Sequence, residues 1–346
     1  MDILKGRNLN KLVLKIINFH IELSIDSQSI LDEIEKDFSY FKDSNLDKIT
    51  DFNLRINCSL VDKYNLPSGL IAKKQSQNSI TYDVGNIRYN DYYGEALTQI
   101  DYKKNIVEMV YKNESLAHEI LYLVILSRTT KFLDGLGYHK IHASAFTYSN
   151  FNILFMMPSK GGKSTMLLEM LRNPEVGLIS DDTPVVNRKG EIIPFPLRLG
   201  NDDRNKVINF FPYLRDEDIS LFKRKYYSDK YLVDIKKIKN KIQTKDKTIL
   251  IAGYRSTNIE PKIELISKMK MLSELKTHLI VGIGLPMVIE YFIENTLNDH
   301  FKNLRILFSR FFTAIILVQK SECYRIALSS NPVENCHAIK RLLDEK

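Results

Sequence analysis

The most restrictive feature of the sequence is a phosphate-binding loop pattern set between two apolar runs. Residues 152–156 predict a buried strand, residues 157–165 read MPSKGGKST, and residues 166–171 predict a helix. In such a unit the backbone N–H groups of the loop and of the helix N-terminus point at an anion, which the helix dipole also favours. Lys163 is predicted to reach the outer phosphates of a nucleotide, and the Ser164 hydroxyl to hold Mg²⁺.

Composition places the chain among globular proteins. Its 346 residues, 44% of them hydrophobic and 27% charged, give room for two domains and a substantial core. The net charge is +8, but basic residues are interleaved with acidic ones. The densest basic run, residues 236–241, is more typical of a solvated face than of a docking site for an acidic partner. No nucleic-acid partner is therefore expected.

Cysteine usage and hydropathy predict a cytoplasmic protein. Cys58, Cys323 and Cys336 lie far apart and form no CxxC pair, which argues against a zinc site or a disulfide framework and indicates a reducing compartment. The N-terminus lacks the apolar stretch of a signal peptide. The longest apolar runs fall well short of the roughly 20 residues that a membrane span needs, so no membrane partner is expected.

The hydrophobic pattern predicts a mixed α/β chain in two parts: a small α+β region at 1–112, and a domain at 113–346 that carries the loop at 157–165. In the first part we expect a helix at 27–41 and strands at 12–24, 51–61, 79–89 and 97–112. In the second part we expect helices at 114–133, 269–277, 286–297, 299–311 and 333–343. We expect strands there at 138–148, 248–252, 262–267, 312–318 and 323–329, the last two forming a hairpin.

Two histidines precede the loop strand. Residues 138–148 are predicted to form one strand that turns at 149–150 and pairs with the strand that delivers the phosphate loop. His139 and His142 have odd spacing on this strand and therefore point to opposite faces. At most one of the two is expected to face the site.

Two adjacent carboxylates follow the loop helix. The run 176–180 predicts a buried strand that ends in Asp181 and Asp182. Like charges this close are costly unless a metal or a cation offsets them. Either Asp182 caps the next segment, as aspartates in turns do, or the pair serves Mg²⁺ coordination and base catalysis. The position directly after a phosphate-loop helix favours the second interpretation.

Taken together, these stretches resemble the HPr kinase/phosphorylase superfamily, specifically the HPr-kinase-related kinases that include enzymes modifying ribosomally made peptides. In that family a strand with a His in an H-x-S/G setting precedes a G-x-S-G-x-G-K-S/T loop, and a strand ending in S/A-D-D follows. The matching stretches here are 142–144, 158–165 and 180–182. The resemblance covers about 139–200, with weaker support at 324–343.

The resemblance implies a fold similar to the nucleotide domain of phosphoenolpyruvate carboxykinase, in which a mixed sheet holds the phosphate loop between strand and helix. It also implies a homo-oligomer, ATP and Mg²⁺ as cofactors, and transfer of the γ-phosphoryl group to a hydroxyl, usually serine, of a peptide or protein. Phosphoryl transfer depends mostly on positioning and charge neutralisation, so a cation, a metal and one base are sufficient.

The resemblance assigns roles by position. Lys163 would bind the β- and γ-phosphates, and Ser164 and Asp182 would hold the metal. Asp181 would take the proton of the acceptor hydroxyl, with His142 beside it. The nucleotide-binding set comprises Pro158, Ser159, Lys160, Gly161, Gly162, Lys163, Ser164 and Thr165.

The loop and the arginines depart from the family pattern. Met157 and Lys160 replace the first and fourth loop residues, both usually Gly, which serves where φ is positive or where the backbone meets a phosphate closely. Lys160 either adds a second cation at the phosphates or points to solvent. The arginine signature of the true HPr kinases is not found, and three candidates remain for stabilising the transferred phosphoryl group: Arg198, Arg204 and Arg255.

Several functions stay open. The favoured one is a kinase of a serine or other hydroxyl on a peptide or protein, such as a ribosomal precursor peptide, with 1–112 as a recognition module. The others are a kinase of a small-molecule hydroxyl and a regulatory nucleotide-binding protein whose degenerate loop supports no transfer. An ordinary P-loop NTPase fits less well, because Asp181 follows Lys163 closely and His142 precedes the loop.

Overall fold

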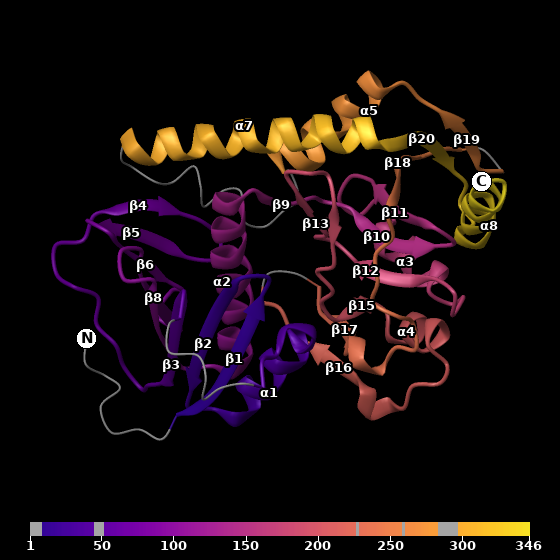
Figure 1. Ribbon diagram of the computed structural model, residues 1–346. Coiled ribbons are helices and arrows are strands. Elements are labelled where there is room, and N and C mark those ends of the chain that lie inside the picture. Colours follow the sequence, from indigo (N-terminus) through magenta and orange to yellow (C-terminus); the bar gives the residue numbers. More distant parts are fainter. Residues whose placement is uncertain (1–8, 45–51, 226–227, 258–259, 283–296) are drawn as a thin grey trace. The chain divides into compact units, whose positions relative to one another are not determined.

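The computed structural model shows a mixed α/β protein with several mixed β-sheets (Figure 1). By its internal contacts the chain divides into two compact units. The first comprises Met1–Ile125 and Leu221–Lys230, and the second comprises Leu126–Ser220 and Tyr231–Lys346. The boundary therefore falls within helix α2 (Glu114–Leu136). The structure describes residues 9–44, 52–225, 228–257, 260–282 and 297–346.

An eight-stranded sheet dominates the first unit, in the order β1-β2-β3-β8-β7-β6-β5-β4. The pairs β2–β3 and β3–β8 are parallel, and the other neighbours are antiparallel. The strand expected at 51–61 is present, with Leu54, Ile56 and Cys58 buried, but the alternation of buried and exposed residues ends there, because Ser59 is buried and Leu60 is exposed. The strands are β1 (Asn10–Ile16), β2 (Phe19–Ile25), β3 (Leu54–Leu60), β4 (Ala72–Gln75), β5 (Ile80–Val84), β6 (Ile87–Asp91), β7 (Ala96–Asp101) and β8 (Ile106–Tyr111).

Three stretches that were expected to be single strands are hairpins. Residues 12–24 form β1 and β2, 79–89 form β5 and β6, and 97–112 form β7 and β8. The sequence hides the first turn because Ile17, at φ 59°, is a β-branched residue that rarely adopts this conformation. The turn after β5 contains Gly85 at φ 58°, a conformation that glycine adopts without steric cost.

A six-stranded sheet in the order β12-β10-β11-β18-β20-β19 forms the centre of the second unit. The pairs β11–β18 and β18–β20 are parallel, while β10 is antiparallel to β11 and β12, and β19 to β20. The strands are β10 (Ser144–Tyr148), β11 (Phe151–Met156), β12 (Gly177–Ser180), β18 (Lys247–Arg255), β19 (Lys262–Leu265) and β20 (Ser321–Leu328). The turn predicted at 149–150 does join β10 to β11.

Helices bury both faces of this central sheet, which explains why its inner strands read as continuous apolar runs. One face packs against α3 and α8, and the other against α5 and α7. Ile153 and Phe155 of β11 contribute to the first core, and Leu154 and Met156 to the second. Besides α2, the described residues of the whole chain form the helices α1 (Gln28–Asp37), α3 (Lys163–Met170), α4 (Arg204–Phe210), α5 (Lys268–Leu275), α7 (Leu297–Lys320) and α8 (Pro332–Asp344).

Two three-stranded sheets complete the described chain, in the orders β14-β13-β9 and β15-β17-β16. The prediction of one strand at 138–148 was wrong, because β9 and β10 belong to different sheets and residues 141–143 lie between them. The strands are β9 (Tyr138–Lys140), β13 (Val185–Asn187), β14 (Ile192–Ile193), β15 (Leu199–Asn201), β16 (Ile219–Phe222) and β17 (Lys230–Val233).

The predicted closing hairpin is also wrong. Residues 312–318 form the last turns of α7, where Ala314, Leu317 and Val318 are buried at helical spacing. A short apolar run does not distinguish a buried strand from a buried helix segment. The partner strand is correct, but β20 pairs with β18 and β19 instead. The helix predicted at 286–297 lies, except for its last residue, outside the described residues.

A fully buried ion pair connects α2 to α7. Arg310 Nη2 lies 2.5 Å from Asp134 Oδ2, and Arg310 Nε donates to Asp134 Oδ1 at 3.1 Å. His139 Nδ1 lies 2.7 Å from the same Oδ1, and His139 Nε2 lies 2.9 Å from Ser309 Oγ. Burial alone raises the pKa of Asp134, but Arg310 and His139 outweigh it and hold this pKa below its ordinary value. His139 is therefore committed to this network.

Lys140 gives the protein a measurable pH dependence. Its Nζ lies 4.0 Å from the centre of the Phe195 ring, and burial lowers its pKa to about 7 although Asp134 opposes the shift. Between that value and about 10.4 the unfolded chain binds a proton that the native protein lacks, so stability rises with pH by about 1.4 kcal/mol per unit. We expect Lys140→Met to be more stable than wild type near pH 7, by a margin that shrinks as the pH rises. Urea denaturation of both proteins from pH 7 to pH 9.5 measures this; a constant margin would show that native Lys140 stays charged.

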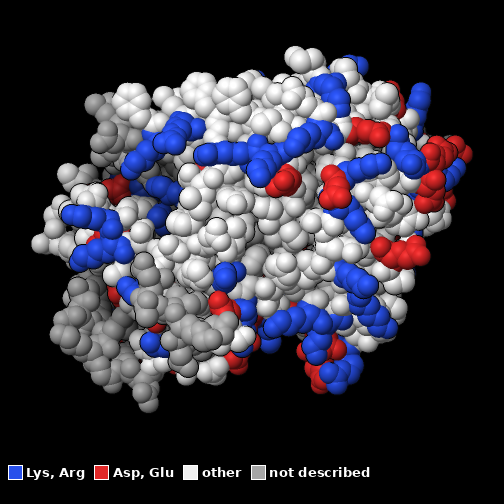
Figure 2. Space-filling model, in the orientation of Figure 1, with Lys and Arg blue, Asp and Glu red and all other residues white. Residues whose placement is uncertain are grey.

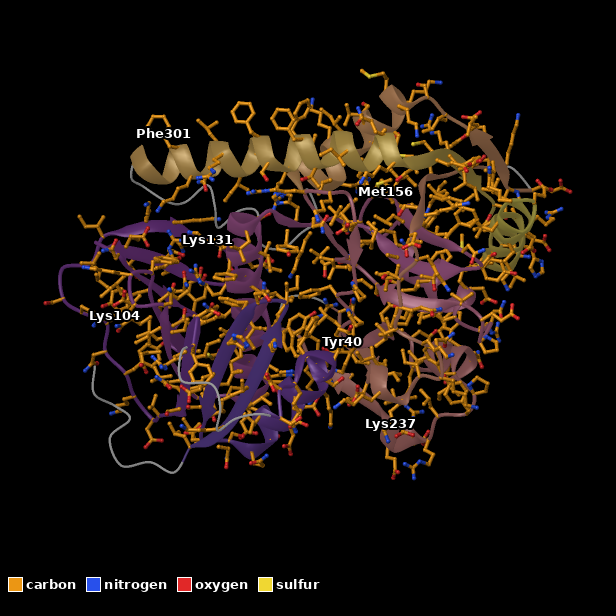
Figure 3. All side chains as sticks on the ribbon, viewed as in Figure 1. Tyr40, Lys104, Lys131, Met156, Lys237 and Phe301 are labelled. Carbon is orange, nitrogen blue, oxygen red and sulfur yellow. The ribbon has the colours of Figure 1, made fainter. Side chains whose placement is uncertain are left out.

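An exposed apolar stripe runs along α7. Figure 3 shows the Phe301 ring projecting outward from this helix. On the face drawn in Figure 2, Lys and Arg side chains are scattered among Asp and Glu over the rest of the surface. Within the described part of the chain, no helix is both long and apolar enough to cross a bilayer. Large exposed apolar patches mark interaction surfaces, and the members of this one are Phe301, Leu304, Leu307, Phe308, Phe311 and Phe312.

Candidate active site

The strand–loop–helix unit predicted from the sequence is present in the second unit. All residues of β11 are buried, and Met156, labelled in Figure 3, is its last residue. The loop follows directly, and α3 begins at Lys163 with Gly162 at its N-cap. The glycine has φ 114°, a conformation that residues with a Cβ rarely adopt. The loop after β11 thus leads directly into the N-terminus of α3. A helix N-terminus of this kind is a usual setting for an anion site.

Close contacts within the loop leave no room for a side chain at Gly161. A Cβ at Gly161 would lie 2.8 Å from the Pro158 carbonyl oxygen and 2.9 Å from Met157 Cβ, closer than such atoms approach. The tight turn is closed by the Gly161 N–H, which donates to Pro158 O at 3.0 Å. Gly161 is therefore required by lack of space for a side chain and not by a positive φ.

Met157 keeps an ordinary backbone conformation at the position where Gly is usual. Its φ is not positive, and its side chain is buried. It packs where two other residues lack a Cβ: a Cβ built on Gly253 of β18 would lie 2.9 Å from Met157 Cγ, and one on Gly161 would lie 3.2 Å from Met157 Cε. Met157 is therefore a core residue accommodated by small neighbours.

Lys160 is the strained residue of the loop. It is exposed and has φ 59°, the left-handed conformation for which the family pattern has Gly. Its carbonyl oxygen accepts from Arg255 Nη2 at 2.9 Å, and Arg255 Nε lies 3.5 Å from Gly161 O. Arg255, at the end of β18, thus holds two consecutive loop carbonyls.

Lys160→Gly separates the two interpretations of this side chain. Glycine relieves a strain of the order of 1 kcal/mol, partly offset by its greater freedom in the unfolded chain, so we expect thermal stability to stay equal or to rise slightly. If Lys160 points to solvent, the affinity for Mg·ATP is unchanged. If it adds a cation at the phosphates, the affinity of Lys160→Gly for Mg·ATP falls about fivefold or more. The affinity of Lys160→Ala, a variant that keeps the backbone strain, falls by the same factor. Calorimetric titration and thermal melting measure both effects.

Lys163, the first residue of α3, folds back on the loop. Its Nζ donates to Met157 O at 3.0 Å and lies 3.4 Å from Pro158 O. Burial lowers its pKa, while the charges of Asp182 and Asp181 oppose that shift. The buried ammonium therefore interacts with the charges of the adjacent carboxylates.

The two carboxylates lie in the bend after β12, beside residues from the start of β10. Ser144 Oγ donates to Asp181 O at 2.6 Å and lies 3.3 Å from Asp181 Oδ1. His142 Nε2 lies 3.3 Å from Asp182 Oδ1. The resemblance places His142 beside Asp181, whereas this contact is with Asp182. His142 is buried and Asp182 half-exposed, so the histidine supports the carboxylate from the protein side.

His142 reaches this place because the chain bends between β9 and β10. The Ile141 N–H donates to Pro184 O at 3.0 Å, and the His142 N–H donates to His278 O at 2.9 Å. Strand alternation therefore does not set the direction of His142, although His139 and His142 do serve different environments. Sequence reasoning missed His278, whose ring centre lies 5.7 Å from that of His142. Its only sequence signal is a histidine after an amphipathic helix, which is too weak to assign.

The three candidate arginines have distinct environments. Arg198 is buried, and Arg204 forms a surface ion pair with Asp216 at 2.8 Å. Arg255 contacts the loop, as described above. Arg255 is thus a candidate for which a direct contact with the loop is observed.

The remaining predicted loop residues surround the helix N-terminus. Pro158 and Ser159 are exposed, and Ser164 and Thr165 are half-buried. Among the described residues, no group of three or more His, Cys, Asp or Glu side chains is arranged to hold a metal by itself. Mg²⁺ typically takes one or two protein oxygens together with waters and substrate phosphates, so a hydroxyl and an exposed carboxylate are a chemically suitable set.

Comparison with known proteins adds no family to this geometry. A scan against protein-family models gives no match for the chain, and a search of curated proteins likewise finds no matching sequence.

Proposed function

We propose that the chain is an ATP-dependent kinase that transfers the γ-phosphoryl group to a serine hydroxyl of a peptide or protein. We place it in the HPr kinase/phosphorylase superfamily, with a nucleotide domain similar to that of phosphoenolpyruvate carboxykinase. One observation carries the proposal: β11, which leads into the loop and Lys163, and β12, which leads into Asp181 and Asp182, are both antiparallel to β10, so the loop and the acidic pair lie at the same edge of the central sheet. A phosphate loop, its lysine and an acidic pair are the parts that phosphoryl transfer to a hydroxyl requires.

Each residue of the site has a separate role in the proposed phosphoryl transfer. On nucleotide binding, Lys163 exchanges the loop carbonyls for the β- and γ-phosphate oxygens. Ser164 and Asp182 would hold Mg²⁺, which neutralises charge on those phosphates. Asp181 accepts the proton of the acceptor hydroxyl as its oxygen bonds to the γ-phosphorus, and the bond to the β-phosphate oxygen breaks with its electron pair leaving on ADP. Ser144 holds Asp181 by its carbonyl, so the base is positioned before the acceptor arrives.

His142 has a supporting role in this scheme. Its contact with Asp182 fixes the carboxylate that would face the metal, as residues hydrogen-bonded to metal ligands generally do. This differs from the base-tuning role that the resemblance implies. The roles of Asp181 and Asp182 are therefore the point that experiments on this site must separate.

A regulatory nucleotide-binding protein is the second candidate. Lys160 at φ 59° and the buried Met157 are the observations that favour it, because both depart from the glycines of a working loop. The close turn at Gly161 and the helix cap at Gly162 favour the kinase. A kinase of a small-molecule hydroxyl uses the same residues and differs only in its acceptor.

Nucleotide binding and label transfer distinguish these functions. The purified chain is titrated with Mg·ATP and then incubated with γ-labelled ATP and an extract of the producing cell. Label on a peptide or protein supports the proposal, and label on small molecules supports the small-molecule kinase. Binding without any labelled acceptor favours the regulatory protein, and absence of binding overturns all three.

The proposed homo-oligomer concerns a different surface. The exposed apolar stripe of α7, from Phe301 to Phe312, is the observation that supports an association partner. We propose no nucleic-acid or membrane partner, since basic residues are interleaved with acidic ones along the sequence. The first unit, with its large sheet, is proposed to recognise the substrate.

A further inference from the structure

His278 is a buried polar residue for which the scheme above has no use. It belongs to a π-helical turn, Lys276–Val281, that directly follows α5. Such turns are rare and frequently occur at functional sites. The residue is only 5% exposed, and its Nδ1 has no hydrogen-bond partner among the residues that the structure describes. Buried polar atoms normally have a partner, so this nitrogen requires an explanation.

The surroundings of His278 belong to the phosphate site. Its carbonyl accepts from the His142 N–H, and its ring lies 5.7 Å from the His142 ring, which contacts Asp182. Burial, followed by the charges of His142 and Lys163, lowers the pKa of His278 to about 4, while a contact with the His142 backbone opposes the shift. The ring is therefore neutral at neutral pH, beside His142 and within reach of the charge of Lys163.

We propose that His278 is a further phosphate-binding residue, whose Nδ1–H donates to the terminal phosphoryl group of bound ATP. The inference rests on the proposed kinase function. An ionised phosphoryl oxygen only accepts hydrogen bonds, so a neutral ring meets it with a proton on the facing nitrogen. Lys163 is the residue that binds the outer phosphates, and its charge reaches His278. ADP lacks the terminal group, so this contact favours ATP over ADP.

Two amide substitutions test which nitrogen matters. In His278→Asn the amide nitrogen takes a position close to that of Nδ1, whereas in His278→Gln it reaches toward that of Nε2. His278→Leu removes both. The full chain and these three variants are titrated with Mg·ADP and with the Mg²⁺ complex of the imido analogue of ATP. We expect the Leu and Gln variants to lose about tenfold or more in affinity for the ATP analogue but no more than twofold for ADP. We expect the Asn variant to retain most of the wild-type preference for the ATP analogue over ADP.

Other outcomes overturn the inference. Equal losses for both nucleotides, or unchanged binding of both, would show a structural histidine. If His278→Gln kept the preference for the ATP analogue over ADP as well as His278→Asn does, Nδ1 would not be the contact atom. Thermal melting verifies folding, and if the Leu variant does not fold, the comparison of Asn with Gln decides. If wild type transfers phosphate while the variants keep its ATP preference, this inference fails alone. If wild type binds neither nucleotide, the proposed function fails with it.

Discussion

Asp181→Asn is expected to slow γ-phosphoryl transfer about 10²–10⁴-fold while Mg·ATP binding changes only a few-fold. Asparagine has nearly the shape of aspartate, but its amide cannot take the proton of the acceptor hydroxyl. The Ser144 hydroxyl still donates to the residue 181 carbonyl, because that contact is to the backbone. The measurement is label transfer from γ-labelled ATP to an acceptor found in the cell extract, under single-turnover conditions.

The neighbouring carboxylate supplies a matched control. Asp182→Asn makes the same chemical change one residue away, and it should raise the Mg²⁺ concentration needed for half-maximal transfer instead of removing the base. Equal transfer by wild type and Asp181→Asn would remove the base role from Asp181. Exchanged behaviour of the two variants would assign the base to Asp182, which the contact with His142 makes a concrete alternative.

Asp134→Ala is expected to lower the free energy of unfolding by about 3–5 kcal/mol. The change leaves Arg310 charged and buried without its carboxylate, and it removes the hydrogen-bond partner of His139 Nδ1. Uncompensated charge in the interior costs far more than an exposed charge does. Urea denaturation followed by circular dichroism measures the loss.

An exposed aspartate–arginine pair is the control for this prediction. Asp216 lies 2.8 Å from Arg204 Nη2, and its side chain is 85% exposed. Asp216→Ala should have a small effect, as exposed ion pairs generally do. The double variant Asp134→Leu/Arg310→Met should be more stable than Asp134→Ala, because no buried charge is left unpaired. Similar losses in Asp134→Ala and Asp216→Ala would contradict the buried-charge argument.

Local sequence signals predicted the elements where one physical cause dominates. The apolar run at 152–156 forms β11, and the stretch expected to be a helix at 333–343 forms α8, because strand burial and helix periodicity are local properties. The short apolar run 312–318 was misread as a strand, since its burial pattern arises only when α7 packs on the central sheet. The hairpin at Ile17 was missed because its turn residue is untypical.

The sequence by itself determined the strand–loop–helix unit, its lysine and the acidic pair, because each is a short stretch whose residue types are constrained by local backbone chemistry. Only the tertiary structure decided which groups meet: His142 with Asp182, Arg255 with the loop carbonyls, and Met157 against Gly253. It alone brought His278 to this site. Such contacts join distant residues through the packing of sheets and helices, and no local pattern records which side chains that packing brings together.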